Sequence, residues 1–395
     1  MYTSFTIPPQ RSILASDRTN GEVPDIARFA GTRRNLVYSR FRRLVEHLAA
    51  RIGARIIMSN APTTPVRLKD IARDLNVSVM TVSKVVRGCA DVGAETRSRV
   101  LARIKELNYQ PNWVARSLAA RRTFMIGLIV PDLMHSFFAE IAKGVSATIR
   151  PLGYDVVICN SEEDSAVESS EVERLLARQV DGLLLASAQA PSSLSLFERI
   201  EARGVPYVLI DRRFAESHAS YVGADDEAIG RLATNHLIER GCRRIAHIAG
   251  PPLTPGVGRQ KGYQDALAAA GIAVPESYVV HATDDASGYL AARRLLALEP
   301  RPDAIFGYND PTAAGAMKAI LEAGIAIPRE IKVIGAGNVH YSDLLRVPLS
   351  TIDQSSTTIG QQAADMLIKS IGAKRKRPAK IVLIDPILVP RESTR

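Results

Sequence analysis

The pattern of apolar positions between residues 66 and 86 predicts two short helices separated by a tight turn. In the first segment the apolar residues recur at steps of three and four, which places them on one stripe of a helix. These residues are Val66, Leu68, Ile71, Ala72 and Leu75. Asn76-Val77-Ser78 interrupts the pattern, with Ser78 as the expected N-cap, and helical spacing resumes from Val79 to Val86.

Two helices joined by so short a turn are typical of helix-turn-helix proteins, in which the second helix enters the major groove and its first residues contact base edges. The base contacts expected on this geometry are Val79, Met80, Thr81 and Lys84. Contacts to the DNA backbone are expected from Ser78, Ser83 and Asn112. From this segment alone, a helical hairpin in some other fold remains the alternative.

The following segment favours the DNA-binding interpretation. Glu95 to Asn108 predicts a third helix, and a third helix closes the core of a headpiece over residues 65–110. Its expected inward residues are Val100, Leu101, Ile104 and Leu107. Pro111 ends this helix, and residues 111–122 form a weakly apolar hinge with basic flanks.

Beyond residue 123 the period changes, because short apolar runs alternate with helical stretches. FMIGLIV, YDVVICN, DGLLLAS and VPYVLID predict buried strands with helices between them, and a second series follows with RRIAHIAG, YVVHAT, DAIFGYN and IKVIGAG. Alternation of this kind gives parallel sheets that are covered on both faces. The sequence therefore predicts an α/β domain over residues 123–395 with two similar, doubly wound lobes.

Polar side chains follow several of these predicted strands. Asp132 follows the first strand, Asp211-Arg212-Arg213 follows VPYVLI, Asn309-Asp310 follows AIFGY, and Asp353-Gln354 follows LSTI. Ligands of α/β lobes bind at the carboxyl ends of the strands. These side chains are therefore candidates for hydrogen bonds to the hydroxyl groups of a ligand in the cleft between the lobes.

Composition narrows the class of protein. The net charge is +10, and residues 58–122 hold twelve Lys and Arg against five acids, whereas residues 123–395 hold 29 against 32. A basic headpiece on a slightly acidic body suits docking of one end on phosphates.

The cysteines at 89, 159 and 242 form no metal-ligand pattern, so we expect reduced thiols and no metal or other cofactor. No run of 18 apolar residues and no signal peptide is found, so we expect a cytoplasmic protein with no membrane partner.

Residues 1–57 differ from the rest of the chain. A polar start with several prolines is followed by the Arg-rich segment RRNLVYSRFRRLVEHLAARIGARII. We expect this extension to be disordered or not native, with Met58 as the true start of the protein. The rival hypothesis is a genuine basic arm that adds non-specific affinity for DNA, and the first peptide of the native protein, identified by mass spectrometry, distinguishes the two.

LKDIARDLNVSVMTVSKVVRG, followed by LNYQPNWVARSLAARRT, resembles the lac repressor and gal repressor family of bacterial transcription regulators. The resemblance implies a type I periplasmic-binding-protein-like effector domain after the headpiece. Lobe 1 would comprise about 123–223 and 355–377, and lobe 2 about 224–354 and 378–395. It also implies a hinge that becomes helical on the operator, with Leu118 and Ala115 at the minor groove and Leu118 as the wedge that kinks the duplex.

The same resemblance implies roles for residues around the cleft. Asp211 would contact the effector, Arg259 would reach across to it, Asn309 and Asp310 would recognise hydroxyls, and Gln354 would close the hinge side. His135, Phe137 and Phe138 would line lobe 1, and Asn338, in the turn at 335–338, would contact the effector. An N-cap role for Asp310, and core packing for one of the two phenylalanines, are the alternatives.

One departure from the family pattern changes the expected ligand. Where many relatives have a Gly-aromatic-Asp-Asp turn, this chain has Gly335-Ala336-Gly337-Asn338, so both carboxylates are missing. A lost carboxylate near Arg212, Arg213 and Arg259 predicts a more positive cleft, which favours a sugar acid or sugar phosphate over a neutral sugar.

The expected function is that of a DNA-binding repressor, active as a homodimer on a pseudo-palindromic operator and controlled by a carbohydrate-like effector. An enzyme is disfavoured because no GxGxxG opens a helix after the first strand and neither GxxxxGK[ST] nor GxSxG occurs. A solute-binding receptor without a DNA role is the remaining alternative, and it conflicts with the basic headpiece and hinge.

Overall fold

The computed structural model describes residues 66–86, 88–110, 117, 120–214, 216–373, 375 and 378–395, in two compact units that divide after Pro111. The expected hinge contacts Asn112, Ala115 and Leu118 lie outside the described residues, as does the N-terminal extension. None of the described helices is long and apolar enough to cross a membrane.

The first unit contains the three predicted helices, α2 (Leu68–Leu75), α3 (Val79–Val86) and α4 (Ala94–Glu106). Asn76 ends α2 in the left-handed conformation, with a φ of 52°, and the Ser78 hydroxyl caps α3 by accepting a hydrogen bond of 3.0 Å from the Thr81 amide. The core residues are Ile71, Ala72, Val82, Val85 and Val100. The prediction that Leu101 points inward is wrong, because this side chain is 49% exposed on α4.

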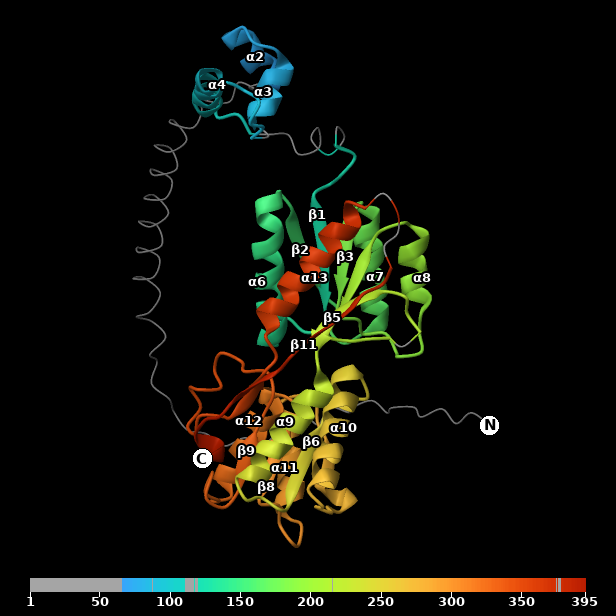
Figure 1. Ribbon diagram of the computed structural model, residues 1–395, viewed down its shortest axis with the longest axis vertical. Helices are drawn as coiled ribbons and strands as arrows, with labels where there is room; N and C mark the ends of the chain where they lie inside the picture. The colour runs from blue at the N-terminus through green and yellow to red at the C-terminus, as the bar shows by residue number, and fades with distance from the viewer. Residues whose placement is uncertain are drawn as a thin grey trace, which may run out of the picture. The chain divides into compact units, whose positions relative to one another are not determined.

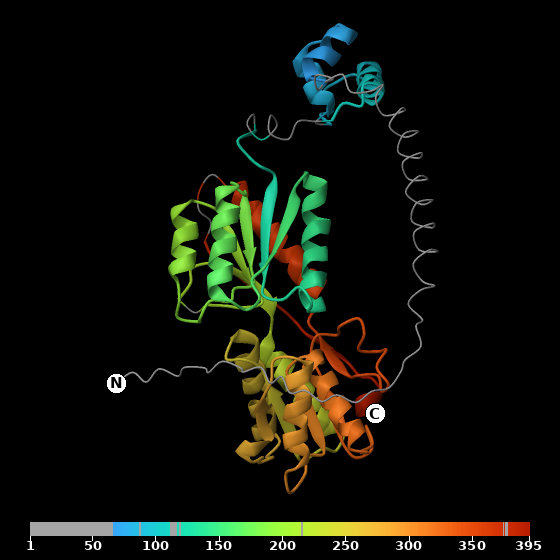
Figure 2. The same ribbon diagram turned by 180° about the vertical axis from the view of Figure 1, so that it is seen from behind.

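Lobe 1 of the second unit is built on a parallel sheet with the strand order β11-β5-β4-β3-β1-β2. Its strands are β1 (Met125–Val130), β2 (Asp155–Asn160), β3 (Gly182–Leu185), β4 (Tyr207–Ile210), β5 (Ser220–Ala224) and β11 (Ile381–Ile384). Its helices are α6 (Ser136–Ile149), the turn η1 (Arg150–Leu152), α7 (Ser165–Ala177), α8 (Ser195–Ala202) and α13 (Ser356–Ile371). Alternate strand residues pack on α6 and α13 on one face, towards the viewer in Figure 1, and on α7 and α8 on the other, towards the viewer in Figure 2.

Lobe 2 repeats this arrangement on a smaller parallel sheet with the order β7-β6-β8-β9, beside an antiparallel pair of β10 and β12. Its strands are β6 (Ile245–Ala249), β7 (Val279–His281), β8 (Ala304–Gly307), β9 (Lys332–Ile334), β10 (Thr351–Asp353) and β12 (Ile387–Val389). Its helices are α9 (Asp226–Glu239), α10 (Thr254–Ala269), η2 (Glu276–Tyr278), α11 (Asp285–Leu296), α12 (Asp310–Glu322) and η3 (Glu392–Thr394). Helices α9 and α10 pack on one face of the sheet, and α11 and α12 pack on the other.

The last connection between the lobes differs from the predicted one. The sequence places it near residue 378, but β11 pairs with β5 from Ile381 to Ile384 and therefore belongs to lobe 1. The chain returns to lobe 2 only after Ile384, where β12 pairs with β10. β11 forms the edge of the lobe 1 sheet, and its residues alternate between exposed and half-buried. The prediction rested on fully buried parallel strands, and β11 is not one of them.

His247 lies fully buried in β6 at the centre of lobe 2. Its ring stacks against the rings of Tyr263 and Phe306, with centroid distances of 5.0 and 4.6 Å, and Nδ1 donates a hydrogen bond of 2.9 Å to the Phe306 carbonyl. Nε2 has no partner among the described residues. Burial lowers the pKa of His247 to about 4, because the interior disfavours the charged ring.

Stability is therefore expected to fall with acidification. The folded-state pKa of His247 lies below the unfolded value of about 6.5, so the unfolded chain takes up the proton first, and stability present above pH 6.5 is lost as the pH falls towards 4. His247→Asn, which keeps a donor near the Nδ1 position, should remove up to about 3 kcal/mol of this pH dependence while lowering stability at pH 8. Urea unfolding from pH 8 to pH 4 measures the difference, and parallel curves for both proteins would contradict it.

Candidate functional site

A cavity of about 680 Å³ lies between the two lobes, at the carboxyl ends of strands from both sheets. Most of the predicted effector residues line it, together with Phe138, Asp132 and Arg212. The predicted residues in the wall are His135, Phe137, Asp211, Arg259, Asn309 and Gln354. Most of the side chains that the strand-end rule selected therefore meet at one cavity.

Arg259 extends from α10 and is almost fully buried, with 3% exposure. Its Nε donates to the Asp226 carboxylate at 3.0 Å, Nη1 to the Tyr308 carbonyl at 2.6 Å, and Nη2 to the Gln354 side-chain oxygen at 2.8 Å. Each nitrogen of the guanidinium thus has a partner in the protein, and two N–H groups remain for other acceptors.

Asp211 follows β4 with a φ of 62°, a left-handed conformation that is uncommon outside glycine, asparagine and aspartate. Its side chain is 12% exposed, and no described residue donates a hydrogen bond to its carboxylate; the nearest cation is Arg212 Nε, 3.7 Å from Oδ2. Burial raises the pKa of Asp211, and the neighbouring Arg212 and Arg259 oppose this effect. The carboxylate oxygens are therefore available to accept hydrogen bonds from a ligand.

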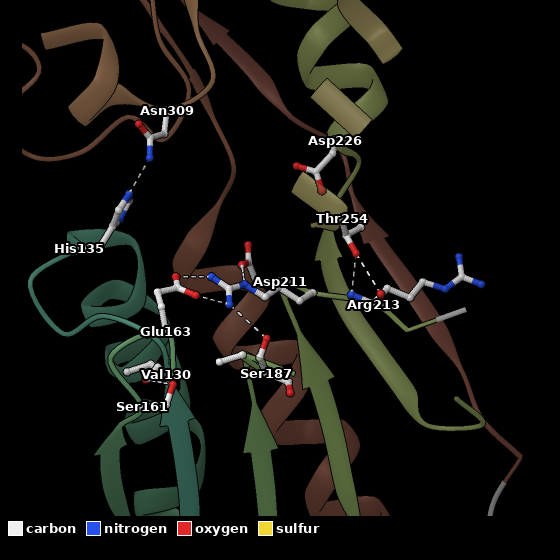
Figure 3. A network of polar contacts seen from close by, with 12 residues as sticks. Val130, His135, Ser161, Glu163, Ser187, Asp211, Arg213, Asp226, Thr254 and Asn309 are labelled. Carbon is white, nitrogen blue, oxygen red and sulfur yellow. Dashed lines mark hydrogen bonds and ion pairs between the residues drawn. The ribbon is translucent and has the colours of Figure 1, made fainter. Parts of the chain in front are cut away.

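Two contacts bridge the lobes beside the cavity (Figure 3). The Thr254 hydroxyl accepts a hydrogen bond of 2.9 Å from the Arg213 amide and donates one of 3.0 Å to the Arg213 carbonyl. On the other side, His135 Nε2 lies 3.5 Å from Asn309 Nδ2. The two lobes thus touch each other at both contacts.

The His135–Asn309 contact brings two hydrogen-bond donors together. His135 Nδ1 accepts from the Phe137 amide at 3.3 Å, and burial lowers the pKa of His135, so the neutral ring carries its proton on Nε2. The Asn309 Oδ1 atom accepts from the Thr312 amide at 2.9 Å, which directs Nδ2 towards His135. Two N–H groups from different lobes therefore face each other without an acceptor between them.

Arg212 is bound by Glu163 rather than left free for a ligand (Figure 3). Nη1 donates to Oε2 at 2.7 Å and Nη2 to Oε1 at 2.5 Å, and Nη1 also donates to the Ser187 carbonyl at 3.1 Å. This is the parallel, bidentate geometry that a guanidinium forms with a carboxylate.

The structure places Asp310 and Asn338 outside the cavity wall, contrary to the prediction. Asp310 is fully buried, and its carboxylate accepts hydrogen bonds from the Val339 amide and from the Ser342 and Thr351 hydroxyls, at 2.9, 2.8 and 2.5 Å. Asn338 is bound by Arg391 and Asp353. Both side chains hold the 335–342 loop in place, because a buried carboxylate needs donors and this loop provides them.

The predicted positive cleft is also wrong. The wall contains five carboxylates, Asp132, Glu162, Glu163, Asp211 and Asp284, against the two guanidiniums of Arg212 and Arg259. Arg213 is exposed and does not line the cavity. Loss of the family carboxylate at Gly337 therefore leaves a cavity that is still acidic, and no group of three or more metal-ligating side chains occurs among the described residues.

Sequence reasoning missed several wall residues, of which Asn160, Glu163 and Tyr308 matter most here. Asn160 and Tyr308 were within reach of the strand-end rule, since Asn160 ends β2 and Tyr308 directly follows β8. The Asn160 Oδ1 atom is buried without a partner among the described residues. Glu163 had no such signal, because its role depends on an arginine 49 residues away.

In the headpiece, the start of α3 presents the predicted DNA-reading side chains. Val79 and Met80 are 47% and 62% exposed, which is high for apolar residues. Thr81 Oγ1 lies 2.8 Å from the Ser78 hydroxyl, and Lys84 Nζ donates to Asp91 Oδ2 at 2.6 Å. Ser83 is half-buried on the same helix. Lys84 therefore has an acidic partner within the headpiece, which the sequence pattern did not reveal.

Two family profiles match the chain. The profile described as "Bacterial regulatory proteins, lacI family" covers residues 67–112, and the profile described as "Periplasmic binding protein-like domain" covers residues 234–394. The ribose operon repressor of Halalkalibacterium halodurans is 35% identical, over 83% of this chain and 97% of its own length. The HTH-type transcriptional repressor PurR of Klebsiella pneumoniae is 37% identical, over 82% of this chain and 96% of its own length.

Solved structures agree with these relatives. The lac repressor dimer bound to operator and the anti-inducer ONPF is 28% identical, with a TM-score of 0.72, and the similarity covers 84% of this chain and 99% of that one. A complex of the regulator CelR with cellobiose is 30% identical, with a TM-score of 0.64, over 83% of this chain and 99% of that one. The named relatives are transcriptional repressors rather than enzymes or solute receptors. This chain therefore belongs to the lacI family of bacterial regulatory proteins and is a DNA-binding transcriptional regulator with a small-molecule effector domain.

Proposed function

We propose that the chain is a homodimeric repressor whose effector is a small, hydroxyl-rich molecule bound in the cavity between the lobes. The observation that carries the proposal is the Asp211 carboxylate, which lies in the cavity wall with 12% exposure, accepts no hydrogen bond from a described residue and has Arg212 Nε as an ion-pair partner at 3.7 Å. A largely shielded carboxylate whose oxygens accept no hydrogen bond gains free energy from a ligand that supplies hydroxyl donors. The cellobiose bound by the structural neighbour CelR is a compound of this class.

The opposite wall supplies the complementary groups. The His135 and Asn309 nitrogens lie 3.5 Å apart, and an acceptor oxygen to one side of the pair can accept a hydrogen bond from both. Further donors come from the uncommitted N–H groups of Arg259 and from the Gln354 amide. A molecule with hydroxyl groups on one side and a ring or carbonyl oxygen on the other meets both requirements.

Effector binding controls DNA binding through lobe closure. The two bridging contacts, Thr254 with Arg213 and His135 with Asn309, form only when the lobes approach each other, so a ligand held between the lobes changes the balance between open and closed forms. The effector unit is joined directly to the hinge residues 111–122, through which the change reaches the headpiece. Linkage requires that operator DNA alters effector affinity by the same factor.

A single headpiece buries little area on DNA, so specific recognition requires two of them, held by paired effector domains on a pseudo-palindrome. Val79 and Met80 meet thymine methyl groups, Thr81 and Lys84 donate to base edges, and Ser78 contacts the backbone. Leu118 enters the minor groove as a wedge. The chain acts in the cytoplasm by binding and release rather than by catalysis.

Asp211→Asn provides the test of the effector site. Asparagine tolerates a positive φ, so the change removes the negative charge without straining the backbone. We expect the stabilising neutral sugar to bind at least tenfold more weakly to this variant, while operator affinity without ligand stays unchanged. Thermal shifts over a panel of sugars including ribose and cellobiose measure the first effect, and DNA titration measures the second.

Asp265→Asn is the matched control, because Asp265 is an exposed aspartate on α10 whose partner is Lys261, away from the cavity wall. Equal ligand affinity in the two variants would contradict the proposed role of Asp211.

Lys84→Ala tests the DNA-reading helix. If Lys84 leaves Asp91 to donate to a base, the variant should lose about 1 to 3 kcal/mol of discrimination at one operator position in each half-site. Binding-site selection with wild type and variant, at one salt concentration, measures this. An equal loss on every sequence would instead identify Lys84 as a phosphate contact, and no loss would show that it stays on Asp91.

A further inference from the structure

The pairing of Glu163 with Arg212 joins a buried cation to a carboxylate at the rim of the cavity. The Arg212 side chain is 8% exposed and is anchored by the Ser187 carbonyl at 3.1 Å, whereas the Glu163 side chain is 55% exposed. Both residues line the cavity. The guanidinium thus belongs to the fixed floor of lobe 1, and the carboxylate comes from the loop that follows β2.

The backbone of this loop holds Glu163 in place at some conformational cost. Glu162 and Glu163 have φ values of 53° and 57°, and successive left-handed residues other than glycine are unfavourable. Hydrogen bonds from the Ser161 amide to the Val130 carbonyl, at 2.9 Å, and from the Glu163 amide to the Pro131 carbonyl, at 3.2 Å, fasten the loop to the end of β1. Asp164 then caps α7. The loop is therefore anchored on both sides of Glu163.

A ligand carboxylate or phosphate would require the position that Glu163 occupies. Arginine recognises such groups through the two parallel hydrogen bonds that Glu163 already makes. Arg259, the other guanidinium in the wall, is committed to Asp226, Tyr308 and Gln354. An anion entering the cavity would find the Arg212 guanidinium occupied by Glu163, every nitrogen of Arg259 already bound and the Asp211 carboxylate close by. A neutral hydroxyl group needs only a single N–H, such as one of the two that Arg259 has left.

We propose that Glu163 is a charge filter that determines ligand specificity: by occupying Arg212, it restricts the cavity to neutral hydroxylated molecules and rejects their carboxylate and phosphate counterparts. The inference rests on the proposed function, since it specifies which chemical class of effector the same cavity accepts. It assigns the acidic loop, rather than the turn at Gly337, the decisive role in selecting ligand charge.

Glu162 provides an internal control. It precedes Glu163 in the same loop, has nearly the same φ and also lines the cavity, but it makes no ion pair with Arg212. Replacing either residue with glutamine removes one negative charge from the wall and preserves side-chain size. A general change in cavity charge affects both variants equally, whereas release of the Arg212 guanidinium affects only Glu163→Gln.

The test compares wild type, Glu163→Gln and Glu162→Gln by thermal shift and calorimetry on the full chain. The probes are matched neutral and anionic compounds, namely glucose with gluconate and glucuronate, and ribose with ribose 5-phosphate. We expect neutral members alone to stabilise wild type and Glu162→Gln. In Glu163→Gln, the affinity for an anionic member should rise at least tenfold relative to its neutral counterpart. Melting temperature without ligand and operator binding verify folding, and Glu163→Ala repeats the test with the side chain removed.

An unchanged ratio of anionic to neutral affinity in both Glu163 variants would overturn the charge filter, as would wild type that prefers the anionic members. If Glu163→Gln gains anion binding while wild type binds none of the neutral sugars, the filter is supported and the proposed neutral effector is overturned. A gain of equal size in Glu162→Gln would replace the specific pair with a general electrostatic effect.

Discussion

The guanidinium of Arg259 binds residues at two of the segments where the chain crosses between the lobes. Asp226, its first partner, directly follows the crossing from lobe 1 into lobe 2, and Gln354, another partner, lies at the crossing back. Tyr308 contributes a carbonyl from the end of β8. Because a buried cation is tolerated only with good partners, this arrangement requires the crossings and the strand end to keep one relative position. The shape of the effector cavity depends on that requirement.

The environments of three arginines explain why the sequence predicted a positive cleft, whereas the wall of the cavity is acidic. The missing carboxylate at Gly337 beside three arginines suggested a positive cavity, but each arginine has a different environment. Arg259 is paired within lobe 2, Arg212 is paired with Glu163, and Arg213 is exposed while its backbone binds Thr254. Pairing depends on residues far apart in the sequence, so it becomes visible only when the fold brings them together. Asp310 shows the same limit for a carboxylate. It was predicted to bind a ligand because it follows a strand, but its side chain accepts hydrogen bonds from the 335–342 loop.

Much of the fold followed from periodicity alone. The three headpiece helices and the central strands of both lobes were predictable, because buried apolar runs and helical stripes are strong local signals. The strands β5, β11 and β12 were missed. β11 alternates in exposure at the edge of the sheet, β5 contains Ser220, Tyr221 and Gly223 instead of an aliphatic run, and β12 has only three residues. The strand-end rule found most of the cavity wall, but roles such as that of Glu163 depend on a loop conformation that no periodic pattern encodes.

The late position of β11 and η3 in the chain has a consequence for biosynthesis. The sheet of lobe 1 gains its edge strand only at Ile381–Ile384, and the core of lobe 2 receives Ser393 and Thr394, which are fully buried and bond to Ser350, with Thr394 also contacting His236. The helices of the headpiece, by contrast, make their core contacts within residues 66–109. Domains fold as they leave the ribosome. The DNA-binding headpiece can therefore fold before β11 and η3, which complete the two lobes of the effector domain, have been synthesised. A nascent chain thus has a DNA-reading surface before it has a means of responding to the effector.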